Sequence, residues 1–242
     1  MKNVTSDTIS LRGAGIVTVA QLAKGHRFTL DSILLADFCR VKPKERVLEP
    51  GAGTGIVSLL LAKKYPRSLF YPVEVQENLH ALCSDNCTAN VLANITPLHR
   101  DIRKLNQSRD LKHFEVLVAN PPYMRSGAGR SSPDAGRRIA RQDLLAKIES
   151  WLDLKKLLKQ GGRYNLVFPA ARLAELVALM RQRRLEPKRI RPVHSYQDKP
   201  ASLVLVEAVK DGGTGVEMLP PLVVHEPGGA YSGEMKDIYH LS

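Results

Sequence analysis

The chain has 242 residues and a mass of 26.8 kDa, which fits one large domain or one domain with an appendage. Hydrophobic residues make up 43% and charged residues 25%, and no stretch approaches the ~20 consecutive apolar residues that span a bilayer. The first seven residues lack the apolar core of a secretory signal, and three cysteines do not make a disulfide framework, so we expect a cytoplasmic protein. The cysteines also do not supply a full set of metal ligands, so we expect no metal site.

Positive charge is concentrated in one part of the chain. The net charge is +12, and the stretch 124–195 holds seventeen Lys or Arg against six Asp or Glu, so the rest is nearly neutral. A one-sided surplus of this kind is typical of a protein with a polyanion partner such as nucleic acid, although a solubilising basic surface is the alternative.

The predicted elements begin with a short, glycine-punctuated N-terminal β extension over residues 1–30. From 31 to 210 strands alternate with helices. We expect helices at 32–38, 56–64, 76–92, 139–158 and 171–184. We expect strands at 46–49, 69–75, 95–100, 114–119, 163–168, 189–194 and 203–209.

This alternation predicts an α/β fold of the Rossmann-like class I type. Its sheet has seven mostly parallel strands with helices on both faces. The last two strands have no helix between them, so they must pair as an antiparallel hairpin. After residue 210 the Gly/Pro-rich segment 211–242 predicts an irregular C-terminal tail that packs on the domain.

A glycine-rich turn follows the first strand of the alternating region and reads Glu49-Pro50-Gly51-Ala52-Gly53-Thr54-Gly55. Glycines allow a tight turn and let a ligand lie directly against the backbone. A dinucleotide-binding turn has the spacing Gly-x-Gly-x-x-Gly, whereas the spacing here, Gly-x-Gly-x-Gly, is typical of methyltransferases. A plain tight turn is the alternative interpretation.

Two acids end the next two predicted strands. Glu74 lies about 20 residues past the turn, where an acid can accept both ribose hydroxyls of an adenosyl group. Asp101 ends the third strand and could accept a hydrogen bond from the exocyclic amine of the adenine in such an adenosyl group. The alternative is that it caps a helix.

The motif Asn120-Pro121-Pro122-Tyr123 follows the fourth strand. Two prolines fix the backbone and remove two donors, which predicts a rigid corner at the edge of the sheet where ligands bind. Methylation of an exocyclic amine needs acceptors for the two amine hydrogens, because its lone pair is conjugated into the ring. The Asn120 side-chain oxygen and the Pro121 carbonyl can be those acceptors, and Tyr123 can stack on the base.

Several stretches together resemble one known family, the bacterial methyltransferases that act on adenine N6 of valine tRNA next to the anticodon. These stretches are 25–36, 49–55, 73–77, 120–123 and 198–207. The resemblance implies that the cofactor is S-adenosylmethionine, that Phe28 to Asp31 surround its methionine part, and that Asn120 to Tyr123 are catalytic. We therefore expect the following cofactor-binding residues: Phe28, Thr29, Asp31, Glu49, Gly51, Ala52, Gly53, Gly55, Glu74, Val75, Asp101, Ile102 and Asn120.

The expected partner is RNA, most specifically tRNA. Five arginines lie in and just beyond a Gly/Ser-rich loop that follows the catalytic motif, and we expect them to contact RNA phosphates: Arg125, Arg130, Arg137, Arg138 and Arg141.

Three alternatives stay open at this point. The same motif serves enzymes that methylate the side-chain amide of a release-factor glutamine, although those carry a helical N-terminal domain that 30 residues are too few to supply. A second alternative is that the substrate is an adenine of ribosomal RNA or of DNA. A non-catalytic RNA-binding protein on the same fold is the alternative of a different class.

Overall fold

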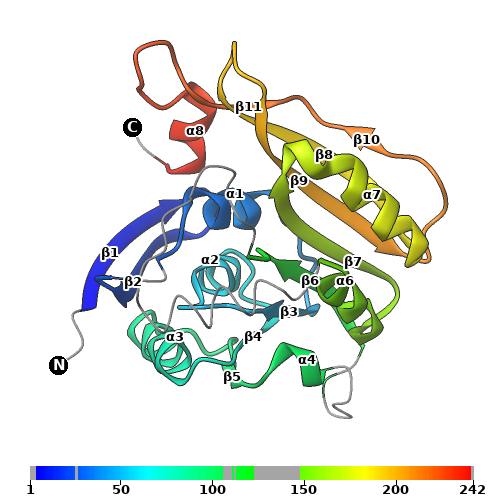
Figure 1. The fold of residues 1–242 in the computed structure, drawn as a ribbon. Helices are drawn as coiled ribbons and strands as arrows, with labels where there is room; N and C mark the ends of the chain where they lie inside the picture. Colours follow the sequence, from blue (N-terminus) through cyan, green and yellow to red (C-terminus); the bar gives the residue numbers. More distant parts are fainter. Residues whose placement is uncertain (1–3, 25–26, 106–110, 112, 123–147, 241–242) are drawn as a thin grey trace.

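The computed structural model describes residues 4–24, 27–105, 111, 113–122 and 148–240. Its centre is a twisted sheet with the strand order β10-β8-β9-β7-β6-β3-β4-β5, and β11 pairs with β8 beside this path (Figure 1). The parallel core is formed by five strands: β3 (Arg46–Pro50), β4 (Leu69–Glu74), β5 (Leu98–His99), β6 (Phe114–Ala119) and β7 (Leu158–Pro169). The predicted α/β class is confirmed.

The sheet ends in the predicted antiparallel arrangement. β9 (Ala201–Lys210) pairs antiparallel with both β7 and β8 (Leu185–Tyr196), so β8 runs parallel to β7. The described residues form nine strands in this sheet rather than seven, because the tail adds β10 (Glu217–Met218) and β11 (Leu222–His225) next to β8.

Helices cover both faces, and strand residues alternate between two hydrophobic clusters. Val47 and Phe70 face the cluster that contains α1 (Leu30–Phe38), α2 (Ile56–Lys64) and α3 (Glu77–Ala89). Leu48 and Val73 face the opposite cluster, which contains α4 (Ile102–Leu105), α6 (Ile148–Leu152) and α7 (Leu173–Gln182). This alternation follows from the two-residue period of a strand.

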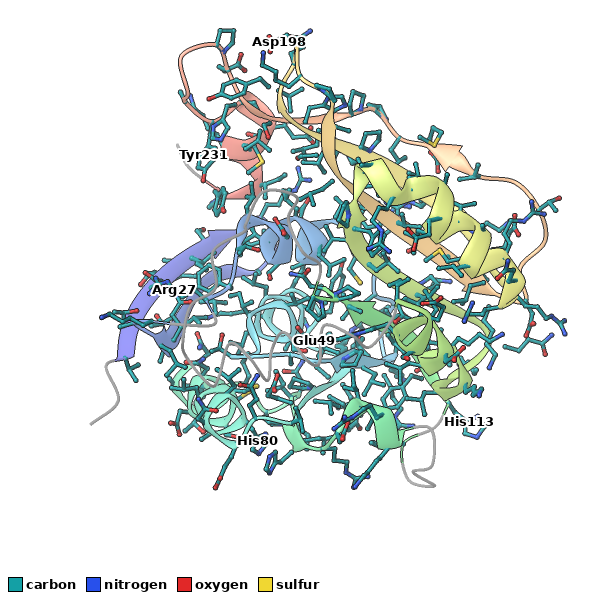
Figure 2. The ribbon with its side chains drawn as sticks, viewed as in Figure 1. Arg27, Glu49, His80, His113, Asp198 and Tyr231 are labelled. Carbon is teal, nitrogen blue, oxygen red and sulfur yellow. The ribbon has the colours of Figure 1, made fainter. Side chains whose placement is uncertain are left out.

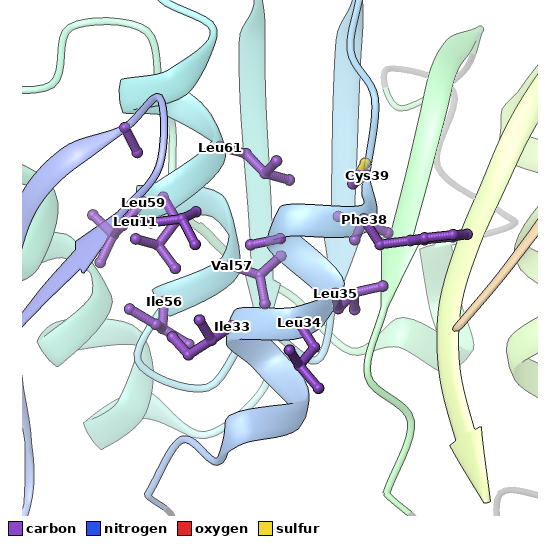
Figure 3. Packing of buried hydrophobic residues seen from close by; sticks show 14 of the residues in the cluster. Leu11, Ile33, Leu34, Leu35, Phe38, Cys39, Ile56, Val57, Leu59 and Leu61 are labelled. Carbon is purple, nitrogen blue, oxygen red and sulfur yellow. The ribbon is translucent and has the colours of Figure 1, made fainter. Parts of the chain in front are cut away.

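The N-terminal segment forms a hairpin outside the main sheet, β1 (Val4–Leu11) and β2 (Gly15–Leu22), with eight antiparallel residue pairs. Its apolar side chains join the cluster around α1 and α2; Figure 3 shows Leu11 beside Leu59 of α2. The hairpin thus extends the core on one side of the molecule (Figure 1).

Two segments differ from the sequence prediction. The helix expected at 139–158 is described only from residue 148, and it ends at Leu152. A 3-10 turn (Asp153–Leu157) follows it. β7 then begins at Leu158, because this residue pairs with Phe114 of β6. The tail expected to be irregular contains β10, β11 and α8 (Gly233–Ile238), whose buried Met235 and Ile238 pack into the α1 cluster.

The strand order places the functional edge. β4 and β5 follow β3 on one side, whereas β6 and β7 lie on the other, so the order reverses between β3 and β6. In open α/β sheets ligands bind at the carboxyl ends of the strands at such a reversal.

Candidate active site

A pocket of about 320 Å³ lies at this reversal point, at the carboxyl ends of β3, β4 and β6. The structure brings nearly all of the predicted cofactor residues to it. The predicted residues that line the pocket are Phe28, Thr29, Asp31, Glu49, Gly51, Ala52, Gly53, Glu74, Val75, Asp101, Ile102, Asn120, Pro121 and Pro122. Tyr123 and the five predicted RNA-binding arginines, Arg125, Arg130, Arg137, Arg138 and Arg141, lie outside the described residues.

The glycine-rich turn forms the wall between β3 and α2. Gly51 and Gly53 have left-handed φ angles of 64° and 59°. A Cβ atom at Gly51 would lie 2.6 Å from Trp151 Cη2, whereas a Cβ at Gly53 would meet no atom within 4 Å. Gly55, also predicted to bind the cofactor, is not among the residues that line the pocket. It precedes α2 with φ 84°, and a Cβ there would lie 2.5 Å from Cys83 Sγ, so this position requires glycine.

Glu74 ties the turn to the end of β4. Its Oε2 accepts a hydrogen bond from Gly53 N at 2.8 Å, and its Oε1 accepts from the backbone N of Val75 and of Gln76, both at 2.9 Å. Because a carboxylate offers about four lone-pair sites, these three bonds orient the group without exhausting its capacity.

Glu49 is a buried carboxyl at the end of β3, at the centre of the view in Figure 2. The backbone N–H and the hydroxyl of Ser58 both donate to its Oε2. Burial raises the pKa of Glu49 to about 7, opposed by the Ser58 hydrogen bonds and assisted by the negative charge of Glu74.

Asp101 and Arg103 line the pocket together. The Arg103 guanidinium donates to both carboxylate oxygens of Asp101, with Nη2 2.7 Å from Oδ2. These hydrogen bonds and the charge of Arg103 hold the pKa of Asp101 below its ordinary value. Val75 also lines the pocket and is 39% exposed, so it gives the pocket an apolar surface.

The Asn-Pro-Pro corner closes the pocket at the end of β6. Asn120 Nδ2 donates to Ser32 Oγ of α1 at 3.2 Å, so the amide nitrogen is turned toward α1. Pro121 and Pro122 have no backbone N–H, and their carbonyls remain as acceptors. The corner therefore presents hydrogen-bond acceptors next to the acid-lined pocket.

Comparison with known proteins decides the family. The methyltransferase small domain family matches residues 24–168. The chain belongs to this family. It is an S-adenosylmethionine-dependent methyltransferase.

Relatives of this methyltransferase include a protein named tRNA1(Val) (adenine(37)-N6)-methyltransferase from Parabacteroides distasonis, which is 26% identical over 73% of this chain and 74% of that protein. A protein of the same name from Tolumonas auensis is 32% identical over 62% of each chain. The solved structure of a predicted O-methyltransferase from Agrobacterium tumefaciens superposes with a TM-score of 0.70 at 20% identity, covering 87% of this chain and 96% of that one, which shows the shared fold.

The pocket of the methyltransferase fits the cofactor in chemistry. Four carboxylates line it, from Asp31, Glu49, Glu74 and Asp101, and they suit a ligand that carries a sulfonium, an ammonium and two ribose hydroxyls. Gly53 leaves open space above the turn, so a ligand can approach the backbone there.

Sequence reasoning missed several pocket residues of the methyltransferase. They are Arg27, Ser32, Thr54, Ile56, Gln76, Arg103 and Trp151. Trp151 comes from α6, beyond the catalytic motif in the chain, and no local pattern places a helix residue against a turn 100 positions earlier. Ser32 lies one position past the predicted Asp31, and only the contact with Asn120 identifies it.

Proposed function

We propose that this methyltransferase transfers a methyl group to the exocyclic N6 amine of an adenine in RNA, with tRNA as the carrier. The observation that carries the proposal is the Asn120-Pro121-Pro122 corner, whose acceptors line the cofactor pocket at the carboxyl end of β6. The names of the curated relatives support the same substrate for this chain. For a protein with this partner we propose a cytoplasmic location.

In this proposal the chain's own residues position the amine. Asn120 Nδ2 is held by Ser32, which leaves Oδ1 to accept one N6 hydrogen, and the Pro121 carbonyl accepts the other. The bound cofactor supplies the electrophilic methyl group on its sulfonium. The two acceptors stabilise the positive charge that develops on N6, and the amine proton is then released to solvent. Tyr123 is proposed to stack on the base.

The carboxylates have separate proposed roles in holding the cofactor. Glu74 accepts the ribose hydroxyls, Asp101 accepts the amine of the cofactor's adenine, and the apolar Val75 and Ile102 contact the ring. Glu49 and Asp31 face the positively charged methionine part. Each role puts an acceptor against a donor or a cation of the ligand.

RNA as the partner is supported by charge. The stretch 124–195 carries its surplus of eleven positive charges directly after the catalytic corner. Arg27 and Arg103 also line the pocket, with 41% and 65% of their side chains exposed. These two cations partly offset the four pocket carboxylates and provide contacts for a polyanion that approaches the same opening.

Replacing Asn120 tests the catalytic assignment. We expect Asn120→Ala to bind the cofactor normally. Its activation free energy in single turnover should be higher by about 2.7–4 kcal/mol, the usual effect of losing one preorganised contact to developing charge. Asn78→Ala, on α3 outside the pocket lining, is the matched control. A rate for Asn120→Ala within a few-fold of the control would remove the corner from the mechanism.

A further inference from the structure

A second pocket, of about 420 Å³, opens at the far end of α1 from the active site. The first turn of α1 supplies Asp31 and Ser32 to the cofactor pocket, and its last turn supplies Asp37 and Phe38 to the second pocket. The two pockets have no lining residue in common, so the second pocket is a separate site.

Five cationic side chains line this pocket: Arg12, Arg40, Lys64, Arg189 and Arg191. Three carboxylates neutralise part of this charge. Asp37 binds Arg12 through both oxygens, at 2.7 and 2.6 Å, and lies 3.8 Å from Lys64. Glu234 binds Arg191 at 2.7 Å, and Glu207 lies 3.4 Å from Arg189. The cluster remains positive after the roughly −0.5 charge at the C-terminal end of α1 is added.

Arg189 is the unusual member of this group. Its side chain is nine-tenths buried and its guanidinium lies 4.5 Å above the Phe38 ring. Nε and Nη1 have no hydrogen-bond partner among the described residues, and the contact with Glu207 does not have hydrogen-bond geometry. These two nitrogens are closed to solvent, and the Glu207 carboxylate compensates the charge, so Arg189 acts on the pocket as a charge in its wall.

Arg40 and Lys64 extend the cation cluster away from Arg189. The Arg40 side chain is exposed and forms no ion pair within the described part of the chain. Lys64 is largely buried, and this burial lowers the pKa of its ammonium. Phe38, Tyr65 and Pro220 give the pocket apolar walls, which strengthen a charge–charge interaction inside it.

We infer that this basic pocket binds a phosphate group, with Arg40 and Lys64 as its donors and Arg189 as a charge in its wall. Guanidinium groups match phosphate oxygens in a bidentate manner, and an ammonium adds a point charge. The phosphate is carried either by a free phosphate compound or by the phosphodiester backbone of RNA. The site does not depend on the proposed function, because its residues take no part in the methyl-transfer pocket.

Calorimetry with pyrophosphate, at fixed ionic strength, tests the pocket directly. We expect one site whose affinity falls about ten-fold or more in Arg40→Glu, the loss that follows from removing a charge-assisted contact. Arg184→Glu is the matched control, because Arg184 is 77% exposed and outside the pocket, and it should leave affinity within about two-fold of wild type. Affinity for the demethylated cofactor should be unchanged in both variants.

Arg189→Gln provides a second test, with its melting temperature measured in parallel. A folded Arg189→Gln protein should bind pyrophosphate more weakly, because a positive charge is lost from the pocket wall. If this variant does not fold, the Arg40→Glu result decides. Absence of pyrophosphate binding by the wild-type protein, or equal losses in Arg40→Glu and Arg184→Glu, would overturn the inference, since diffuse surface charge would then explain any binding.

A tRNA titration in salt identifies the source of the phosphate. If the pocket holds an RNA phosphodiester, Arg40→Glu lowers the log–log salt slope by about 0.7–0.9, one contact, whereas Arg184→Glu does not. If pyrophosphate binding is lost in Arg40→Glu while the slope is unchanged, a free phosphate compound is the ligand. Both results support the phosphate site, and the outcome for tRNA methylation itself bears only on the proposed function.

Discussion

Glu74 carries the most explicit prediction at the scale of single residues. Its carboxylate holds Gly53, Val75 and Gln76 through backbone hydrogen bonds, and we propose that it also accepts the ribose hydroxyls. We expect Glu74→Ala to weaken cofactor binding by roughly 1.5–3 kcal/mol, the usual contribution of hydrogen bonds to a charged group. Glu77→Ala, exposed on α3, is the control, and calorimetry showing equal affinities for the two folded variants would contradict the role of Glu74.

Glu49 makes cofactor binding depend on pH. Its raised pKa, about 7, means that the ligand-free carboxyl is half protonated at neutral pH. A cationic ligand favours the ionised form, so affinity for S-adenosylmethionine should rise as the pH passes upward through 7. The side chain in Glu49→Gln cannot ionise. Dividing the wild-type affinity by the Glu49→Gln affinity at each pH therefore cancels the effect of the ligand's own ionisation. A constant ratio across this range would contradict the placement of Glu49 beside the cation.

The same carboxyl predicts a trend in stability. The folded pKa is raised above the ordinary value of 4.5, so between these values the folded state holds a proton that the unfolded state releases. The stabilisation is complete below 4.5 and is lost as the pH rises through 7. Denaturant unfolding of the ligand-free protein should therefore show a loss of stability over this range that Glu49→Gln lacks; identical pH profiles would contradict it.

At the scale of elements, the two pocket glycines should respond differently to substitution. Both have left-handed φ angles, which costs a non-glycine residue about 1–2 kcal/mol. In Gly51→Ala the new methyl also meets Trp151, and such overpacking adds about 1–3 kcal/mol. In Gly53→Ala it meets open space, so the main loss should be in cofactor binding. Thermal unfolding and calorimetry separate the two, and equal losses of stability would contradict the packing of Trp151 on the turn.

The sequence predicted those elements that a local pattern determines and did not predict those that depend on tertiary contacts. The alternation at 46–119 predicted β3, β4, β5 and β6, because buried apolar runs and intervening helices leave a clear signature. The turn at 49–55 and the corner at 120–122 placed the pocket at the correct edge. The early end of the helix before β7 was not predictable, since pairing of Leu158 with Phe114 determines it. Trp151 and Ser32 reach the pocket by tertiary packing, which no local pattern encodes.

At the scale of the whole molecule, the C-terminal segment contributes to the core. Met235 is fully buried in the α1 cluster, whereas Met218 on β10 is 57% exposed. We expect Met235→Ala to destabilise the protein by about 2–5 kcal/mol because it leaves a cavity. Met218→Ala should change stability by less than about 0.5 kcal/mol. Equal melting temperatures for the two variants would contradict the packing of α8 on the domain.

The positive charge of the molecule predicts how its substrate binds. If RNA phosphates contact the basic stretch, affinity for tRNA should fall with salt at a log–log slope of about 0.7–0.9 per contact. Arg137 and Arg138 lie outside the described residues, and the prediction rests on their place in the sequence. Replacing both with Ala should make the slope shallower and leave cofactor affinity unchanged. A slope equal to that of wild type would remove these two arginines from the RNA contact.

No helix in the described part of the chain is long and apolar enough to cross a membrane, and no group of three or more potential metal ligands occurs there. The chemistry proposed for the molecule rests on the cofactor pocket and on the acceptors of the Asn120-Pro121-Pro122 corner. Above all, we propose that the acceptors of this corner hold an adenine amine of RNA.

The most direct test is incubation with S-adenosylmethionine carrying a labelled methyl group, in parallel with unmodified tRNA and with a release factor, followed by identification of the labelled product. We expect N6-methyladenosine in the tRNA, an initial rate about 10²–10³-fold lower with Asn120→Ala, and no label on the release factor. Label on a glutamine of the release factor and none on the RNA would contradict the proposed substrate while leaving the cofactor pocket in place.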